Sequence, residues 1–177
     1  MKEKKIERAK IKLIKGDITK QSTDAIVNAA NTRLAPGGGV AGAIHRAAGP
    51  KLWEECKSLN GCNTGEAKIT KGYNLPATFV IHTVGPVYSG SKDDEAQLIS
   101  CYKNSLNLAK KHDLKSISFP AISAGAFGYP LKQAARVALQ TTVSWLKENK
   151  STIVVQFVLY DTHSLRVFEQ VFDDEYS

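Results

Sequence analysis

The chain has 177 residues, of which 42% are hydrophobic and 23% charged, the balance of a soluble globular protein with a sizeable core. We expect a single domain over residues 1–177, with residues 1–8 as a flexible basic lead-in. The charged start is not a signal peptide, and no stretch approaches the roughly 18 uninterrupted apolar residues of a membrane span. Three cysteines without a C-x-x-C spacing predict reduced thiols in a cytoplasmic protein and no metal site.

The net charge of +7 is unevenly distributed along the chain. Residues 1–20 hold eight Lys and Arg, whereas residues 161–177 hold five acidic residues and only Arg166. A basic surface attracts polyanions, so nucleic acid is a candidate partner. No aromatic RNA-binding strand or repeated basic helix accompanies these lysines, and we interpret them as solvated side chains. Nucleic acid is therefore not the expected main ligand.

Apolar runs and helical spacings alternate along the chain, which predicts a three-layer α/β/α arrangement. We expect strands at residues 11–14, 25–27, 66–70, 78–84, 116–119 and 152–160. We expect helices at residues 40–48, 51–59, 93–112, 131–147 and 162–172. The first strand has no long helix after it, and strand 66–70 leads directly into another strand. The sheet should therefore be mixed, with antiparallel edges.

The stretch from Asp24 to Ile44 organises the rest of the chain. A short apolar strand is followed by Asn28 and Asn31, then by the glycines of 37–39, and then by the start of a helix. Glycines allow backbone N–H groups to crowd together at a helix N-terminus, where the helix dipole favours an anion. The end of a strand is also where ligands bind in α/β proteins. We therefore expect a phosphorylated, nucleotide-like ligand here, with Asn31 reaching its sugar.

The glycines of this stretch also match the pattern G-x-G-x-x-G over residues 37–42. In a dinucleotide-binding protein the first glycine follows its strand directly, and an acidic residue ends the next strand. Here a whole loop separates Val27 from Gly37, and the acidic residues about 20 positions on, Glu54 and Glu55, fall within a predicted helix. The pattern therefore does not indicate a nicotinamide-dependent dehydrogenase.

A second glycine-containing loop, over residues 123–128, also follows a strand and precedes a helix. Each loop could offer backbone donors to one phosphate, so two loops that face each other would hold a diphosphate. Alternatively, each glycine run is only a tight turn. The presence of two such loops favours the diphosphate.

Several side chains beside these loops have two interpretations each. Asp17 follows the first strand and either accepts a hydrogen bond from a ligand amine or caps the next turn. Asn28 is interpreted as an asparagine that binds its own backbone, whereas Asn31 is freer to face a ligand. Phe127 is either a core residue or a wall against a ribose. Tyr160 is either a core aromatic or a platform for a base.

The four histidines show no spacing from which a catalytic triad could be assembled. His45 lies in the helix after the first glycine loop and is as well suited to a structural role as to a functional one. His82, His112 and His163 have no partner spacing. The sequence therefore offers no nucleophile with an adjacent base.

Six segments together resemble the macro domain family, closest to its MacroD-type branch, whose members remove ADP-ribose from proteins or acetate from O-acetyl-ADP-ribose. The segments are Gly16-Asp17-Ile18-Thr19, Ala25–Asn31, Gly37–Ala48, Thr64-Gly65-Glu66-Ala67, Ile81–Pro86 and Phe119–Pro130. The resemblance covers nearly the whole chain. It implies a three-layer α/β/α macro domain with a mixed six- or seven-stranded sheet, and ADP-ribose across the strand ends. No cofactor or metal is implied.

The resemblance also implies roles for individual residues. Asp17 would bind the adenine amine, Ile18 would line the adenine pocket, and Tyr160 would lie against the adenine. Asn31 would hold the distal ribose and act in catalysis. The first loop, which would wrap that ribose and a phosphate, comprises Gly37, Gly38, Gly39, Val40 and Ala41. The second loop, which would cradle the diphosphate, comprises Ser123, Ala124, Gly125, Ala126 and Phe127, with Phe127 also beside the distal ribose.

One position departs from the MacroD-type pattern G-G-G-V-D-G, because Ala41 occupies the place of the aspartate. That aspartate is thought to activate or orient the attacking water. Viral and archaeal macro domains that resemble this chain in having a small residue there are also hydrolases, with the ligand phosphate proposed to hold the water. We therefore expect hydrolysis of mono-ADP-ribosyl proteins or O-acetyl-ADP-ribose by a cytoplasmic monomer. The alternative, favoured by Ala41, is a non-catalytic module that reads ADP-ribosylated proteins.

Overall fold

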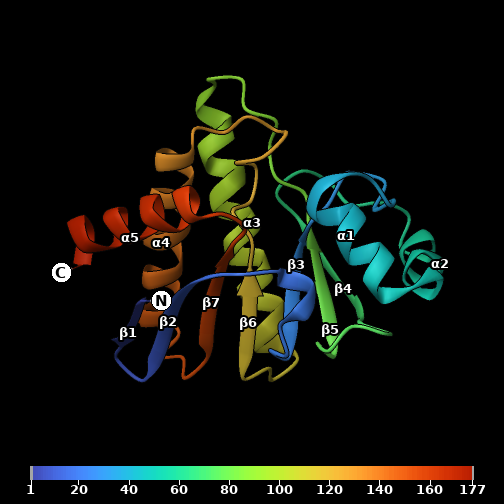
Figure 1. Cartoon of the computed structure of the whole chain (residues 1–177), viewed down its shortest axis with the longest axis horizontal. Helices are drawn as coiled ribbons and strands as arrows, with labels where there is room; N and C mark the ends of the chain where they lie inside the picture. Colours follow the sequence, from blue (N-terminus) through green and yellow to red (C-terminus); the bar gives the residue numbers. More distant parts are fainter. Residues whose placement is uncertain (1, 177) are drawn as a thin grey trace.

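The computed structural model describes residues 2–176 as a mixed seven-stranded sheet with helices on both faces (Figure 1). The strands are β1 (Lys2–Ile6), β2 (Ala9–Lys15), β3 (Ala25–Ala29), β4 (Ala67–Lys71), β5 (Phe79–Thr83), β6 (Ser116–Phe119) and β7 (Val154–Leu159). The helices are α1 (Gly39–Ala48), α2 (Pro50–Ser58), α3 (Lys92–Lys111), α4 (Leu131–Glu148) and α5 (Thr162–Tyr176), with a short 3-10 helix, η1, at Ile18–Lys20. The predicted three-layer fold is confirmed.

The strands lie in the order β1-β2-β7-β6-β3-β5-β4. The five inner strands are parallel, whereas β1 pairs antiparallel with β2, and β4 pairs antiparallel with β5. The prediction of a mixed sheet with antiparallel edges is therefore confirmed. Because the inner strands are parallel, their carboxyl ends share one edge of the sheet, the upper edge in Figure 1.

The beginning of the chain differs from the prediction. Residues 2–6 were expected within a flexible lead-in, but they form the edge strand β1, whose residue Ile6 is buried opposite Ala9. The reason is that exposed and less exposed side chains alternate along this segment. Lys2, Lys4 and Ile6 therefore lie on the face of the sheet that α4 and α5 cover. There Lys4 lies over the ring of Phe172, and Lys2 forms an ion pair with Asp173. Lysines on an edge strand also discourage pairing with another sheet.

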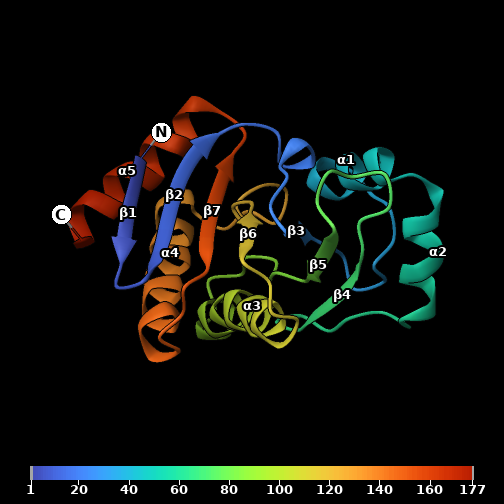
Figure 2. The same cartoon turned by 90° about the horizontal axis from the view of Figure 1, so that it is seen from below.

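Alternation along the strands divides the core into two parts. In β3, Ala25 and Val27 pack on the side of α3, α4 and α5, whereas Ile26 packs on the side of α1 and α2. Figure 2 shows α3 below β6, α4 overlapping β2 and β7, and α1 and α2 at the β3–β5–β4 end of the sheet. No helix among residues 2–176 combines the length and apolarity that a bilayer crossing requires.

The chain leaves the neighbouring strands β3 and β6 toward opposite faces. β3 continues into α1 on one side, and β6 continues into α4 on the other. The pairing of β3 with β6 ends at Ile26 and Ser118, although β3 pairs with β5 as far as Ala29. Such a topological switch point is where open α/β sheets bind their ligands, beyond the carboxyl ends of the strands.

Candidate functional site

The first glycine loop ends at an uncapped helix N-terminus. The N-cap of α1 is Gly38, which has no side chain to cap the helix. The first helical hydrogen bond runs from the N–H of Gly42 to the carbonyl of Gly38, at 3.1 Å. Within the described residues, the N–H groups of Gly39, Val40 and Ala41 donate to no protein acceptor. Three free N–H groups at the positive end of a helix dipole form an anion site.

Glycine is required at two positions here for different geometric reasons. Gly39 has φ of +54°, which glycine adopts without strain. Gly42 allows α1 to approach its own loop, because a Cβ there would overlap the carbonyl oxygen of Gly37. The G-x-G-x-x-G match thus reflects the tight start of α1, in agreement with the rejection of a dinucleotide-binding fingerprint.

The side chain of Asn31 is held by its own loop. Its Oδ1 accepts from the N–H of Arg33 at 3.1 Å and of Ala35 at 3.0 Å, and its Nδ2 donates to the carbonyl of Ala35 at 2.9 Å. These bonds occupy both lone pairs of the oxygen and one of the two amide hydrogens. Asn31 is therefore fixed in place with a single N–H left to offer, so it can orient a ligand hydroxyl or a water but not accept its proton.

The second glycine loop, between β6 and α4, provides another set of free donors. Ser123 has φ of +65°, and its carbonyl accepts a hydrogen bond from the N–H of Tyr129 at 2.9 Å. This bond closes residues 123–129 into a compact turn. Among the described residues, no protein acceptor faces the N–H groups of Gly125, Ala126 and Phe127. Successive free N–H groups in such a turn form an anion-binding concavity.

The second loop is fastened to the end of β5. Ser123 Oγ donates to the carbonyl of Pro86 at 2.8 Å, and the N–H of Tyr88 donates to the carbonyl of Phe127 at 2.8 Å. Gly85 makes this possible, because a Cβ there would overlap Ser123 Oγ. Since β3 lies between β6 and β5, the contacts between this loop and the segment after β5 span the end of β3 (Figure 1). The second loop therefore lies above the point where the first loop begins.

Not all members of the two predicted loops contribute in the same way. The hydroxyl of Ser123 is engaged with Pro86, and the N–H of Ala124 bonds to the carbonyl of Ala121 at 3.3 Å. The N–H of Ser123 itself has no acceptor within the described residues. The free donors of this loop are therefore the N–H groups of Ser123 and of residues 125–127, and the side chain of Phe127 is half-buried.

The residues expected at an adenine lie at the ends of β2 and β7. Asp17 caps η1, with Oδ1 accepting from the N–H of Thr19 at 2.9 Å and from its hydroxyl at 2.7 Å, and these bonds lower the pKa of the carboxyl. Its Oδ2 has no protein partner among residues 2–176. Ile18 is buried on the α1 side. Tyr160 is 86% exposed, so its interpretation as a core residue was wrong.

Asn28 does not bind its own backbone, so that interpretation was also wrong. It belongs to β3, is 1% exposed, and donates through Nδ2 to Nδ1 of His82 at 3.1 Å. The Nε2 of His82 lies 2.9 Å from Thr70 Oγ1, whose hydroxyl donates to the carbonyl of Lys71. His82 is therefore neutral, and burial lowers its pKa to about 3. The sequence offered no signal for this cluster, which depends on strand register.

Two polar groups below the first loop have no partner among the described residues. Oδ1 of Asn28 and both ring nitrogens of His45 are buried and make no hydrogen bond. Burial lowers the pKa of His45, whose ring meets that of Trp53 edge-on. At Ala41, which is 6% exposed, the chain has a methyl group where a carboxylate could have served as a base.

The three cysteines are free and buried, as the prediction of reduced thiols requires. Burial raises the pKa of the Cys56 and Cys101 thiols to about 11, so neither is a thiolate nucleophile at neutral pH. Within residues 2–176, no group of three or more His, Cys, Asp or Glu side chains is arranged to hold a metal ion.

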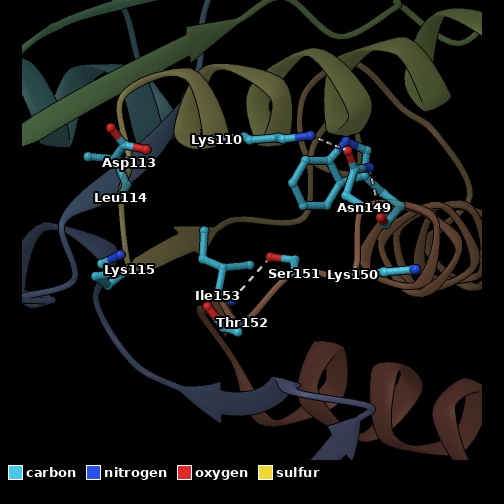
Figure 3. A pocket seen from close by; sticks show the side chains of 10 residues that line it. Lys110, Asp113, Leu114, Lys115, Asn149, Lys150, Ser151, Thr152 and Ile153 are labelled. Atoms are coloured by element: carbon cyan, nitrogen blue, oxygen red, sulfur yellow. Dashed lines mark hydrogen bonds between the residues drawn. The ribbon is translucent and has the colours of Figure 1, made fainter.

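A pocket of about 200 Å³ lies elsewhere, at the amino ends of the strands (Figure 3). It is formed where α3 and α4 end, and Lys110 Nζ donates there to Asn149 Oδ1 at 3.0 Å. Helix C-termini present carbonyl oxygens, which disfavour an anion. This pocket contains no predicted site residue.

Comparison with known proteins gives a family for this architecture. The family model described as Macro domain matches residues 27–138. The chain is 55% identical over 146 residues to the ADP-ribose glycohydrolase MACROD2 of Xenopus laevis, covering 81% of this chain and 35% of that protein. The Oceanobacillus iheyensis macrodomain with ADP superposes with a TM-score of 0.95 at 42% identity, covering 98% of this chain and 95% of that one.

The Trypanosoma brucei macrodomain in complex with ADP-ribose superposes with a TM-score of 0.86 at 46% identity, covering 90% of this chain and 68% of that one. The family model spans more than half of the chain, including both glycine loops, the end of β3 and the whole of β6. The resemblance in the sequence, the topology of the sheet and these comparisons agree, and the chain belongs to the macro domain family.

Proposed function

We propose that the protein binds ADP-ribose along the carboxyl edge of its sheet and hydrolyses ADP-ribose conjugates. The substrates are mono-ADP-ribosyl groups on proteins, O-acetyl-ADP-ribose, or both. The adenine lies between Asp17, Ile18 and Tyr160, and the distal ribose lies beside Asn31 and Phe127. The glycohydrolase name of the MACROD2 relative and the ADP-ribose complex of the trypanosomal macrodomain support this proposal.

The observation that carries the proposal is the presence of two groups of free backbone donors at the carboxyl ends of neighbouring strands. The free N–H groups of residues 39–41 follow β3, those of residues 125–127 follow β6, and β3 pairs with β6. A diphosphate has one anionic group for each. Because backbone donors are fixed by the fold, they hold this charge without reorganisation.

Hydrolysis needs a water placed between a phosphate oxygen of the ligand and the anomeric carbon of the distal ribose. The water oxygen bonds to that carbon, the bond from the carbon to the protein carboxylate breaks, and the phosphate oxygen takes the proton. For an acetyl ester, the water oxygen bonds to the ester carbonyl carbon instead, the bond from that carbon to the ribose oxygen breaks, and acetate leaves while the ribose oxygen takes up a proton as a hydroxyl. Asn31 fixes the ribose through its one free N–H, so that the water lies about 3–3.5 Å from the reacting atom.

Because Ala41 provides no carboxylate, we expect a lower rate of hydrolysis than a side-chain base would allow. General-base catalysis by a side chain contributes about 10²- to 10⁴-fold, and a phosphate oxygen is a weaker base than a positioned carboxylate at neutral pH. The enzyme should therefore be slow, with its catalysis supplied by positioning.

Ala41 also favours a second function, that of a reader. In that case the same pocket holds ADP-ribose on modified proteins without turnover. The two functions share every binding contact and differ only in whether a water is activated. Affinity for ADP-ribose therefore does not distinguish them.

The decisive experiment incubates the protein with a mono-ADP-ribosylated acidic protein and, separately, with O-acetyl-ADP-ribose, and follows the release of ADP-ribose by chromatography. Release from either substrate supports the hydrolase. Measurable binding of ADP-ribose without release from either leaves the reader. No binding of ADP-ribose contradicts both.

We further propose that the protein acts as a monomer in the cytoplasm, and the three free cysteines favour that compartment. Nucleic acid is the competing ligand for its basic N-terminal strands. Binding to nucleic acid would weaken steeply with salt, whereas a diphosphate held by neutral backbone donors should depend on salt far less. A titration of ADP-ribose affinity against salt concentration separates these cases.

A further inference from the structure

Large apolar side chains are exposed at three positions in the described part of the chain, and all three flank the proposed ligand site. They are Tyr160, which is 86% exposed, Val87, which is 64% exposed, and Tyr88, which is 37% exposed. Tyr160 is accounted for by the proposed adenine position. Val87 and Tyr88 lie together on the segment between β5 and α3, and the proposed function gives them no role.

This segment is held by contacts on both sides of Val87, so the exposure of Val87 is part of the fold. The buried carboxylate of Asp94, in the first turn of α3, accepts from the N–H of Ser89 at 2.8 Å and of Gly90 at 2.9 Å. The ring of Tyr88 meets the ring of Tyr129 edge-on, with centroids 5.0 Å apart. A segment held in this way from both sides presents Val87 in one position to solvent.

The segment is also continuous with the ligand site. The N–H of Tyr88 donates to the carbonyl of Phe127, and Phe127 is the residue placed beside the distal ribose. Figure 1 shows the segment between β5 and α3 passing next to the loop between β6 and α4 at the upper edge of the sheet. The anomeric carbon of the distal ribose bears the leaving group. Whatever is attached to ADP-ribose therefore emerges near Val87 and Tyr88.

We propose that Val87 and Tyr88 contact the polypeptide that carries the ADP-ribosyl group, through an apolar side chain next to the modified residue. This inference rests on the proposed function and adds a preference for the acceptor sequence. Two side chains offer a few hundred Å² at most, far below the roughly 1,200 Å² of a stable protein–protein interface. The area suits a short peptide whose affinity comes mainly from ADP-ribose, and is too small for a second copy of this chain.

The test compares the wild type, Val87→Thr and Val87→Ile. Threonine has the shape of valine but is polar, and isoleucine keeps the apolar character, so the pair isolates polarity. The probes are free ADP-ribose and two peptides that carry ADP-ribose through a linkage stable to hydrolysis. The peptides differ only in a leucine or a serine next to the modified residue. Dissociation constants are measured by calorimetry.

We expect the wild type and Val87→Ile to bind the leucine peptide about threefold to tenfold more tightly than the serine peptide, the range expected for one or two apolar contacts. Val87→Thr should lose this preference and bind free ADP-ribose as the wild type does. Equal affinity of the wild type for both peptides would overturn the inference, as would an equal loss of affinity by Val87→Thr for all three probes.

Two other outcomes are distinguishable from these. If the wild type does not bind free ADP-ribose, the proposed function itself fails, and the inference fails with it. If sedimentation shows a wild-type dimer that Val87→Thr abolishes, the two side chains serve self-association, which also overturns the inference.

Discussion

The two glycine loops provide the same kind of donor by different means. The first loop uses the initial turn of α1, so its N–H groups act together with a helix dipole, and the segment that leads into it, residues 31–35, is held by Asn31. The second loop has no helix start behind its donors, since α4 begins only at Leu131, and its shape is held from outside by Pro86 and Tyr88. Substitutions at the first loop should therefore change the rate of turnover. The conformation of the second loop, in contrast, can be changed by a substitution in the neighbouring segment after β5.

The largest expected effect tests the internal support of the first loop. Asn31→Ala removes the one donor that orients the distal ribose, and misplacement by about 1 Å costs on the order of 100-fold in rate. We expect the turnover of a mono-ADP-ribosylated protein to fall by about 100-fold or more, and ADP-ribose affinity to fall by less than tenfold. Release assays and calorimetry on the same preparation measure both. An equal loss in turnover and affinity would mean that Asn31 acts through ligand binding or through the shape of its own loop, and not on the reaction itself.

The sequence could predict the features that depend on residues close together in the chain, but not those that depend on contacts between distant segments. Asn31 and the glycines of 37–39 lie between one strand and the next helix, and residues 123–128 lie between another strand and its helix, so strand ends and turn residues were sufficient to identify both loops. The cluster of Asn28, His82 and Thr70 could not be predicted, because the register of β3 with β5 and of β5 with β4 brings it together.

Two further features were beyond prediction for the same reason. The bond from Ser123 to Pro86 joins segments 37 residues apart, and nothing local indicates it. The strand at residues 2–6 was missed because its lysines resemble a solvated lead-in until the pairing with β2 and the contact with Phe172 are known. Local patterns thus located the donors, whereas the contacts that hold those donors in place required the fold.

The second prediction tests the buried histidine beneath the first loop, a feature that the second loop lacks. In the unfolded chain His82 takes up a proton near its ordinary pKa of 6.5, whereas in the folded protein it stays neutral down to about pH 3. The unfolded state therefore binds more protons as the pH falls through this window, and stability decreases. Between pH 7 and pH 5 the free energy of unfolding should fall by about 2 kcal/mol from this group.

Urea denaturation at a series of pH values measures this decrease. His82→Gln should be less stable at pH 7, yet it should lose much less stability between pH 7 and pH 5 than the wild type. The matched control is His163→Gln, which changes an exposed histidine and should keep the wild-type pH dependence. The same slope in all three proteins would show that His82 is not responsible for it.

The third prediction tests the external support of the second loop. Gly85→Ala places a methyl group against Ser123 Oγ and near Ile122 Cγ2, so the loop must shift. Overpacking of this kind costs about 1–3 kcal/mol, and we expect ADP-ribose affinity to fall about tenfold. Adding Ser123→Ala removes the oxygen that clashes, so the double variant should lose less affinity than the sum of the single losses. Additive losses would indicate that the contact does not position the loop.

The smallest effect is expected where the first loop lacks an acid. Ala41→Asp adds a carboxylate at the start of α1, where it can take a proton from the water, but it also brings a negative charge toward the diphosphate. At about 4 Å in water that repulsion is about 1 kcal/mol, or roughly fivefold in affinity. We expect kcat to rise several-fold and KM to rise by about the same factor. Kinetics on O-acetyl-ADP-ribose would show this compensation as a nearly unchanged kcat/KM.

The matched control is Ala41→Asn, which has the shape of aspartate but no charge. It should change neither constant, because without the charge it can neither take the proton nor repel the phosphates. If Ala41→Asp raised KM alone, the water in this protein would already be fully placed by the ligand and Asn31, and the first loop would need no acid.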